Sequence, residues 1–150
     1  MRLTVATPLV IVVEVGDVVH LRAEDDTGAF GILPGHADFL TALAVSVASW
    51  RDDRGAEHHV AVRGGMLEVR DGNTIGIATP EAVAGDDLQR LGTEVLARFR
   101  RQLAEEQAAR TDAQRLYLAA IRQIARFLRG GETPTMPASP AVGDSDGFGP

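Results

Sequence analysis

The chain has 150 residues, a formal net charge of −6 and 45% hydrophobic residues, enough for one domain or two small ones that share an interface. It contains no cysteine, and all 15 basic residues are arginine, which excludes disulfides, thiolate chemistry, a P-loop lysine and a Schiff-base lysine. The four histidines have no familiar ligand spacing, so we expect no metal site.

Charge is distributed unevenly along the chain. Residues 1–85 carry 6 arginines and 12 acidic residues, for a net charge of −6, whereas residues 86–131 carry 9 arginines and 6 acidic residues, for a net charge of +3. The basic segment indicates an acidic partner, and the overall acidity argues against nucleic acid. No signal-peptide pattern is present and the apolar run at residues 9–13 is too short to span a bilayer, so we expect a cytoplasmic protein without direct membrane insertion.

Short runs of β-branched residues separated by turn signals extend over residues 2–79. The first run alternates and places Leu3 and Val5 on one face. The nearly continuous apolar run at residues 9–15 predicts a strand that is buried on both faces. About eight to ten short strands with frequent turns indicate an all-β sandwich or barrel.

Residues 28–40 contain an unusual concentration of glycine and proline. Three glycines and one proline fall within residues 28–35. Because glycine adopts backbone angles closed to other residues and proline fixes its own φ, this stretch predicts a short strand over residues 30–33 and then a loop of one fixed shape. Such a loop is a candidate docking site, and a structural corner of a β-domain is the alternative.

After Pro80 the hydrophobic period changes to that of a helix. Residues 85–87 (Gly-Asp-Asp) place an N-cap candidate and a second acidic residue at the start of a first helix. Its apolar stripe consists of Leu88, Leu91, Val95, Phe99 and Leu103. Thr111 and Gln114 fit a capping box, which predicts a second helix. The stripe of that helix consists of Ala113, Leu116, Tyr117, Ala120, Ile121, Ile124, Phe127 and Leu128.

These patterns predict three segments. Residues 1–84 form a β-sandwich domain, and residues 85–130 form an antiparallel α-helical hairpin, because the link between the two helices is short. Residues 131–150 are rich in Pro, Gly and Ser and predict a disordered tail. The stripes of the hairpin can cover each other, or they can separate and cover a partner; a hairpin that only decorates the sandwich is the alternative.

Three segments carry a family resemblance. Residues 31–37 read Gly-Ile-Leu-Pro-Gly-His-Ala, residues 60–69 place Gly-Gly between two strands, and residues 82–88 lead from the strands to the helices. In this order and spacing they resemble the epsilon subunit of bacterial F-type ATP synthases. Asp38 stands where the family usually has proline, which resembles a divergent, alternative branch of these synthases.

The resemblance implies a flattened sandwich of two sheets in a non-catalytic central-stalk subunit without a cofactor. Such a subunit couples the gamma subunit to the ring of c subunits, at the cytoplasmic face of the bacterial inner membrane. The implied interface residues are Gly28, Ala29, Phe30, Pro34, Gly35, His36 and Asp38. The turn at residues 28–30 would lie toward the c-ring and His36 toward gamma; a His36 hydrogen-bonded within its own loop is the alternative.

In the family, the helical hairpin switches between folded and extended forms. The extended form inhibits ATP hydrolysis by contacting the catalytic alpha and beta subunits. Carried over to this chain, the candidate regulatory residues are Arg98, Arg101, Arg115, Arg122 and Arg126.

Some family members bind ATP through an Asp-x-x-Arg pattern at the start of the first helix. Asp87 and Arg90 keep this spacing, but Asp86 and Leu91 replace the aliphatic residue and the alanine of the pattern. We therefore expect an ordinary ion pair at the helix start. The alternative functions are a nucleotide-sensing module in which ATP holds the hairpin closed and a scaffold unrelated to any synthase; no nucleophile–base pair supports an enzyme.

Overall fold

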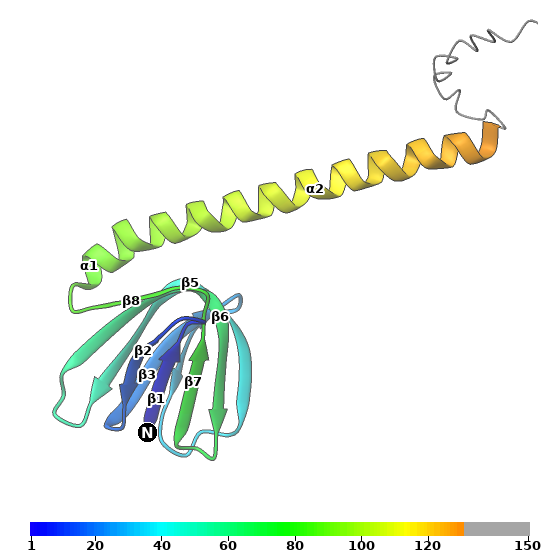
Figure 1. Ribbon diagram of the computed structural model, residues 1–150. Coiled ribbons are helices and arrows are strands. Elements are labelled where there is room, and N and C mark those ends of the chain that lie inside the picture. Colours follow the sequence, from blue (N-terminus) through cyan, green and yellow to red (C-terminus); the bar gives the residue numbers. More distant parts are fainter. Residues whose placement is uncertain (131–150) are drawn as a thin grey trace, which may run out of the picture. The chain divides into compact units, whose positions relative to one another are not determined.

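The computed structural model describes residues 1–130 as eight strands followed by a helical segment (Figure 1). The strands are β1 (Arg2–Ala6), β2 (Ile11–Val15), β3 (Val18–Asp25), β4 (Gly28–Ile32), β5 (Phe39–Asp52), β6 (Glu57–Arg70), β7 (Thr74–Ala78) and β8 (Ala82–Gly85). The helical elements are α1 (Leu88–Arg90), the π-helical turn η1 (Leu91–Val95) and α2 (Leu96–Gly130). The predicted order of a β-sandwich followed by helix is confirmed.

Strands β5 and β6 each contribute to both layers of the sandwich. The strand order is β2-β1-β7-β6-β5-β3-β4, with β8 also paired to β6. The second half of β6 pairs with β7, which in turn pairs in parallel with β1. The first half of β6 pairs with β8, and the second half of β5 pairs with β3. One layer is therefore β2-β1-β7-β6-β5 and the other is β8-β6-β5-β3-β4.

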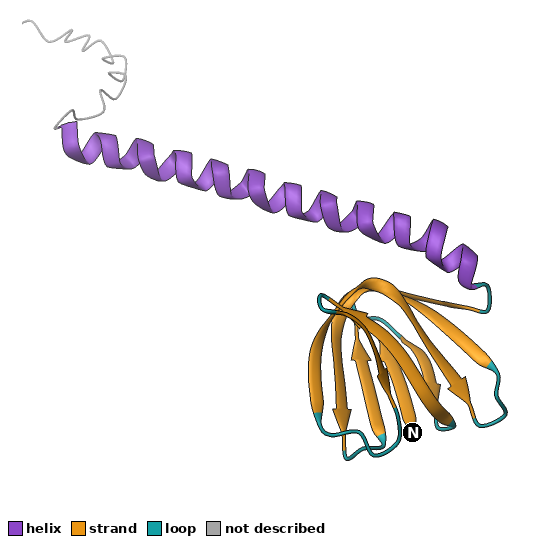
Figure 2. Ribbon diagram, turned by 180° about the vertical axis from the view of Figure 1, so that it is seen from behind, coloured by secondary structure: helices purple, strands orange, loops and turns teal. Residues whose placement is uncertain are grey.

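The two long strands change layer at a glycine pair. Gly64 and Gly65 have φ angles of +71° and +108°, which side-chain-bearing residues rarely adopt. The β5–β6 register passes from Leu43↔Gly65 to Val45↔Arg63 at this point. Both strands curve over the top of the sandwich (Figure 2). The strands predicted separately on either side of this glycine pair are therefore one continuous strand, β6.

The core lies between the two layers. It consists of the side chains that face inward, which occur at every second position along a strand. Leu3 and Val5 are fully buried, as the alternation in β1 predicts. Their partners in the core include Leu21, Ile32, Trp50, Val60, Val62, Leu67, Val69, Ile75 and Ile77. The prediction that residues 9–15 are buried on both faces is wrong. The outer face of β2 is open, since Val13 is buried but Ile11 is 54% exposed, and Leu9, which precedes the strand, is 96% exposed.

The first part of the helical segment packs on the outer face of one layer. Leu91, Leu96 and Phe99 are buried against Ala61 of β6, with Val45, Val47 and Val83 around them. The apolar stripe predicted for the first helix included Val95 and did not include Leu96. The π-helical turn η1 explains the difference, because a wider turn brings residues five apart onto one face.

The predicted antiparallel hairpin is wrong, because α2 runs without a break for 35 residues through the expected link. Thr111 does not cap a new helix. Its hydroxyl donates to the carbonyl oxygen of Gln107, one turn earlier, at 2.9 Å, and the backbone continues as helix. The flanking alanine, glutamine and arginine residues are good helix formers, and neither glycine nor proline interrupts them.

Two compact units divide the chain. The first comprises Met1–Glu106 and so contains the sandwich together with the start of α2, and the second begins at Gln107. The domain boundaries over residues 1–84 and 85–130 stay predictions. The predicted disordered tail, residues 131–150, lies outside the described residues.

Candidate protein-binding site

The turn before β4 is held by hydrogen bonds within the turn and from β5. The Asp25 carboxylate accepts hydrogen bonds from the backbone N–H and the hydroxyl of Thr27, at 2.9 and 2.6 Å, and from the hydroxyl of Thr41 on β5, at 2.9 Å. The bond from the Thr27 hydroxyl, followed by that from Thr41, holds the pKa of Asp25 below its usual value. Gly28, with a φ of +120°, completes the turn, so that Ala29 and Phe30 are presented by a fixed backbone.

The loop at residues 33–38 is held by the β6–β7 turn. The N–H of Gly35 donates to the carbonyl oxygen of Gly72 at 2.8 Å, and Asp38 accepts from the N–H of Asp71 at 2.9 Å. A Cβ on Gly72 would lie 2.9 Å from the Cα of Gly35, so only glycine allows this approach. Asp38 therefore has a structural role, because its carboxylate ties the loop to the neighbouring turn.

Three aromatic side chains connect the loop to β4. The rings of Phe30 and Phe39 meet edge to face, with centroids 5.6 Å apart, and the His36 ring meets Phe39 in the same manner at 5.7 Å. His36 Nδ1 also lies 2.7 Å from the carbonyl oxygen of Ala37. The structure thus brings the two halves of the sequence-predicted site together, and the hydrogen bond of His36 within its own loop is present.

Sequence reasoning missed a row of outward-facing apolar residues on the layer opposite the helix. Strand register places five residues side by side across β5, β6, β7, β1 and β2. We name this set the outer apolar row: Ala42, Met66, Ala78, Ala6 and Ile11. Met66 is 43% exposed and Ile11 is 54% exposed. Alternation within each strand is a signal for such a row, but only the register shows that its members are neighbours.

The outer apolar row and the loop belong to the same layer. Leu40 is exposed on β5. It lies two residues before Ala42, on the same face of the strand, and two residues after Asp38 of the loop. A shallow hollow beside Leu40 is lined by Asp38, Phe39, Glu68, Val69, Arg70 and Asp71. At the other end of the outer apolar row, the exposed residues Leu9 and Val10 directly precede Ile11. Loop, row and β1–β2 turn therefore offer one broad surface for a protein partner.

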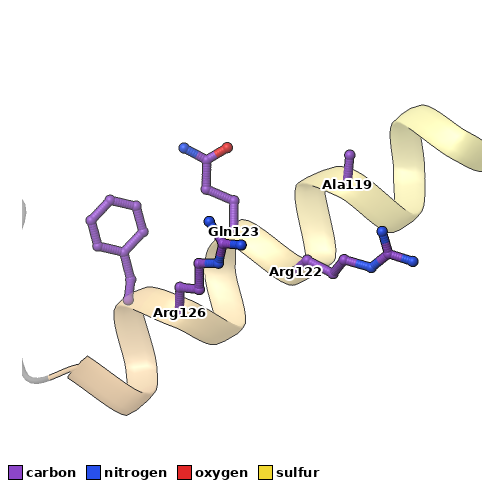
Figure 3. A pocket seen from close by; sticks show the side chains of 5 residues that line it. Ala119, Arg122, Gln123 and Arg126 are labelled. Atoms are coloured by element: carbon purple, nitrogen blue, oxygen red, sulfur yellow. The ribbon is translucent and has the colours of Figure 1, made fainter.

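The candidate regulatory arginines fall into two groups. Arg98 belongs to the first compact unit, where its guanidinium lies 3.0 Å from a carboxylate oxygen of Glu81. Arg101 is exposed on the same part of α2. Arg115, Arg122 and Arg126 lie in the second unit, and Figure 3 shows Arg122 and Arg126 beside Ala119 and Gln123, where with Phe127 they line a hollow along the helix.

Residues 107–130, the described part of the second unit, form an amphipathic stretch of α2. The predicted stripe from Ala113 to Leu128 recurs at steps of three and four, so its members share one face of α2, and its large apolar side chains are exposed. Residues 107–130 carry five arginines and one aspartate, for a net charge of +4. An apolar stripe and a strong positive charge are therefore both presented by this part of the helix.

Asp87 and Arg90, the candidate ATP-site residues, lie at the start of the helical segment. The carboxylate of Asp87 accepts from the backbone N–H of Arg90 at 3.1 Å, so Asp87 is the N-cap of the predicted helix start. The expected Asp87–Arg90 ion pair is absent from the described residues, because the Arg90 guanidinium lies 3.5 Å from Glu94 one turn later. Asp87 and Arg90 nevertheless line one small hollow together with Val83, Leu91 and Val95.

Residues 1–130 contain no group of three or more histidine, aspartate or glutamate residues placed to hold a metal ion. None of their helices combines the length and the apolar character that crossing a membrane requires.

Comparison with known proteins relates the chain to one family. Residues 1–85 match the family model described as "ATP synthase, Delta/Epsilon chain, beta-sandwich domain". The "ATP synthase epsilon chain 2" of Paraburkholderia xenovorans is 41% identical over 129 residues, which cover 86% of this chain and 93% of the relative. The protein of the same name from Cereibacter sphaeroides is 42% identical over 132 residues, which cover 85% and 88%.

A solved structure has the same fold. It is a chain in the cryo-EM structure of the Euglena gracilis mitochondrial ATP synthase, "OSCP/F1/c-ring in rotational state 1", with a TM-score of 0.52 and 24% sequence identity. The match covers 55% of this chain and 51% of the other. At this identity the likeness shows the fold alone.

Proposed function

Because this chain belongs to the epsilon-chain family and is a rotor subunit of an F-type ATP synthase, we propose that its sandwich couples the gamma subunit to the ring of c subunits. The observation that carries this proposal is the contrast between the two outer faces. One is covered by Leu91, Leu96 and Phe99 of the chain's own helix, whereas the outer apolar row is exposed. A rotor body needs an apolar surface that a shaft can cover, and this row supplies it.

Rigidity of the loops supports the same role. Torque passes between subunits only if the contacting segments keep their shape under load. The turn at Gly28 is fixed by the three hydrogen bonds of Asp25, and the loop at residues 33–38 by Gly72 and Asp71. We assign the loop and the outer apolar row to gamma, and the turn with Ala29 and Phe30 to the c-ring.

Single-cysteine cross-linking in the assembled synthase tests these two assignments. The chain has no cysteine, so an introduced thiol is unique in it. We expect a photoactivatable cross-linker on Ala78→Cys to capture gamma and one on Ala29→Cys to capture a c subunit. Ala56→Cys, exposed in the β5–β6 turn, is the matched control and should capture neither. Capture of gamma from Ala56 but not from Ala78 would contradict the assignment.

The helix beyond Glu106 supports a regulatory role. Its exposed apolar stripe and its net charge of +4 fit a groove with apolar walls and acidic residues. We assign this groove to the alpha and beta subunits, where the helix would restrain ATP hydrolysis. Arg115, Arg122 and Arg126 then meet the acidic residues, while Arg98 stays on the sandwich.

Truncation after Glu106 is expected to raise ATP hydrolysis by the assembled synthase several-fold without loss of assembly. The cut lies between the two compact units, so the buried cluster around Phe99 is kept. The ATPase rate is measured at saturating ATP, and a chain that ends at Gly130 serves as the control. If both truncated chains give the rate of the full chain, the helix does not restrain hydrolysis.

Nucleotide sensing is the second candidate, favoured by the hollow that Asp87 and Arg90 line together. Calorimetric titration of the isolated chain with ATP decides it, since absence of heat at millimolar ATP eliminates this role. In either case we infer an accessory subunit without catalysis of its own, located at the cytoplasmic face of the membrane as part of the synthase.

A further inference from the structure

Four of the five arginines in residues 107–130 lie on the side of α2 opposite its apolar stripe. Successive residues of an α-helix are turned by about 100°, so residues two apart lie on nearly opposite sides. Arg122 lies two residues before Ile124 of the stripe, and the other three arginines are likewise two residues from a member of the stripe. We name this set the arginine face: Arg115, Arg122, Arg126 and Arg129.

The arginine face is exposed, and none of its members forms an ion pair with a carboxylate of residues 1–130. Arg122 and Arg126, one helical turn apart, line a hollow of about 470 Å³ together with Ala119, Gln123 and Phe127 (Figure 3). The small side chain of Ala119 leaves this space open. Neighbouring guanidinium groups without a carboxylate partner are a binding site for acidic side chains.

The sequence that follows the helix has the opposite charge. We name residues 131–150 the acidic tail. Its charged residues are Glu132, Asp144 and Asp146, and it contains no basic residue. Asp144 is 14 residues beyond Gly130, a length of chain that spans up to about 46 Å. Arg115, the most distant member of the arginine face, is 15 residues before Gly130, or about 22 Å along the helix. The acidic tail is therefore long enough to reach every member of the face.

The spacing of two carboxylates matches that of two guanidinium groups. Asp144 and Asp146 are two residues apart, so in an extended segment they would project from the same side about 7 Å apart. Arg122 and Arg126 are four residues apart, which places their Cβ atoms about 6 Å apart on the helix. Because the tail is tethered to the helix, its effective concentration there is about millimolar. A separate acidic peptide would have to reach that concentration to compete equally.

We propose that the acidic tail covers the arginine face, with Asp144 and Asp146 at Arg122 and Arg126, whenever no other acidic surface does so. The apolar stripe stays open, because it lies on the opposite side of the helix. Where residues 107–130 enter the groove assigned above to the alpha and beta subunits, acidic residues of that groove must displace the tail. The tail thereby weakens the restraint on ATP hydrolysis. This last step rests on the proposed regulation, whereas the contact within the chain does not.

A spin label in the acidic tail of the full-length isolated chain tests the contact. The chain has no cysteine, so Ala141→Cys provides a single attachment site. In NMR spectra at low ionic strength, we expect the amide signals of residues 115–122 to lose most of their intensity. They should regain it in about 1 M salt, where the Debye length falls to about 3 Å.

Charge-neutral variants of the labelled chain identify the groups in contact. Asp144→Asn with Asp146→Asn should restore the signals at low ionic strength, and so should Arg122→Gln with Arg126→Gln. Arg100→Gln with Arg101→Gln is the matched control, because it removes the same charge from exposed positions of α2 outside the arginine face. In that control the signals should stay weak. Glutamine is a good helix former, so α2 is kept in both arginine variants.

The proposal is overturned if the intact chain shows no loss of signal, or if the loss is the same with and without the carboxylates of Asp144 and Asp146. It is also overturned if the loss appears in an isotope-labelled chain mixed with a separate spin-labelled chain, since the contact is then between two copies.

ATP hydrolysis by the assembled synthase tests the competition. With Asp144→Asn and Asp146→Asn the rate should be lower than with the intact chain, because the groove no longer has to displace the tail. If truncation after Glu106 raises the rate but these two chains give equal rates, the competition is overturned. If that truncation has no effect, the proposed regulation has failed, and the spin-label result decides the contact within the chain by itself.

Discussion

Replacing Gly65 by alanine is expected to lower the free energy of unfolding by about 3 kcal/mol or more. Gly65 has a φ of +108°, and a Cβ built there would collide with the carbonyl oxygen of Ala78 and lie 2.8 Å from the Cα of Thr79. Both neighbours are backbone, so neither can turn aside. The loss arises because β5 and β6 change layer at this glycine pair, and a side chain there separates β6 from β7. Urea denaturation at neutral pH measures it.

Gly76→Ala is the matched control. Gly76 lies within β7, has no positive φ, and a Cβ there meets nothing within 4 Å. Its stability should change by less than about 1 kcal/mol. Equal effects of the two substitutions would mean that the corner at Gly65 tolerates a side chain, and that the Gly-Gly pair of the family has another purpose.

Introducing an arginine into the outer apolar row is expected to weaken binding of the gamma subunit by at least about 100-fold, equivalent to about 2.7 kcal/mol. Ala78→Arg places a charge at the centre of the row, between Met66 and Ala6. A partner that covers the row must then bury that charge without a counter-ion. Because Ala78 is exposed, the isolated chain should keep its stability.

Ala56→Arg provides the comparison, since it adds the same charge at an exposed position in the β5–β6 turn. It should bind gamma as tightly as the unmodified chain. If Ala56→Arg and Ala78→Arg weaken binding equally, added charge alone explains the effect and the row is not the interface.

Local patterns in the sequence predicted local features of the structure. The glycines and proline of residues 28–35 indicated a loop of fixed shape. Residues 85–87 indicated a helix cap, and the cap is local because the side chain of Asp87 reaches backbone only three residues away. Alternation placed Leu3 and Val5 in the core. Each of these depends on neighbouring residues alone, and for that reason one sequence was sufficient.

Features that depend on distant pairing were not accessible in the same way. Met66 and Ala6 flank Ala78 in the outer apolar row only because β7 pairs with β6 on one side and, in parallel, with β1 on the other, and no pattern in these strands shows that register. The hairpin prediction failed because Thr111 fits a capping box equally well when it lies inside a helix. The ion pair between Arg63 and Glu106 joins residues 43 positions apart, and no local pattern in the sequence indicates that they meet.

The most direct test of the account is the affinity of the intact chain for purified gamma subunit, measured by calorimetric titration with the Ala78→Arg chain in parallel. The account predicts saturable binding with one chain per gamma, and little or no heat from Ala78→Arg at the same concentrations. Absence of binding by the intact chain, or identical affinities for the two chains, would contradict it.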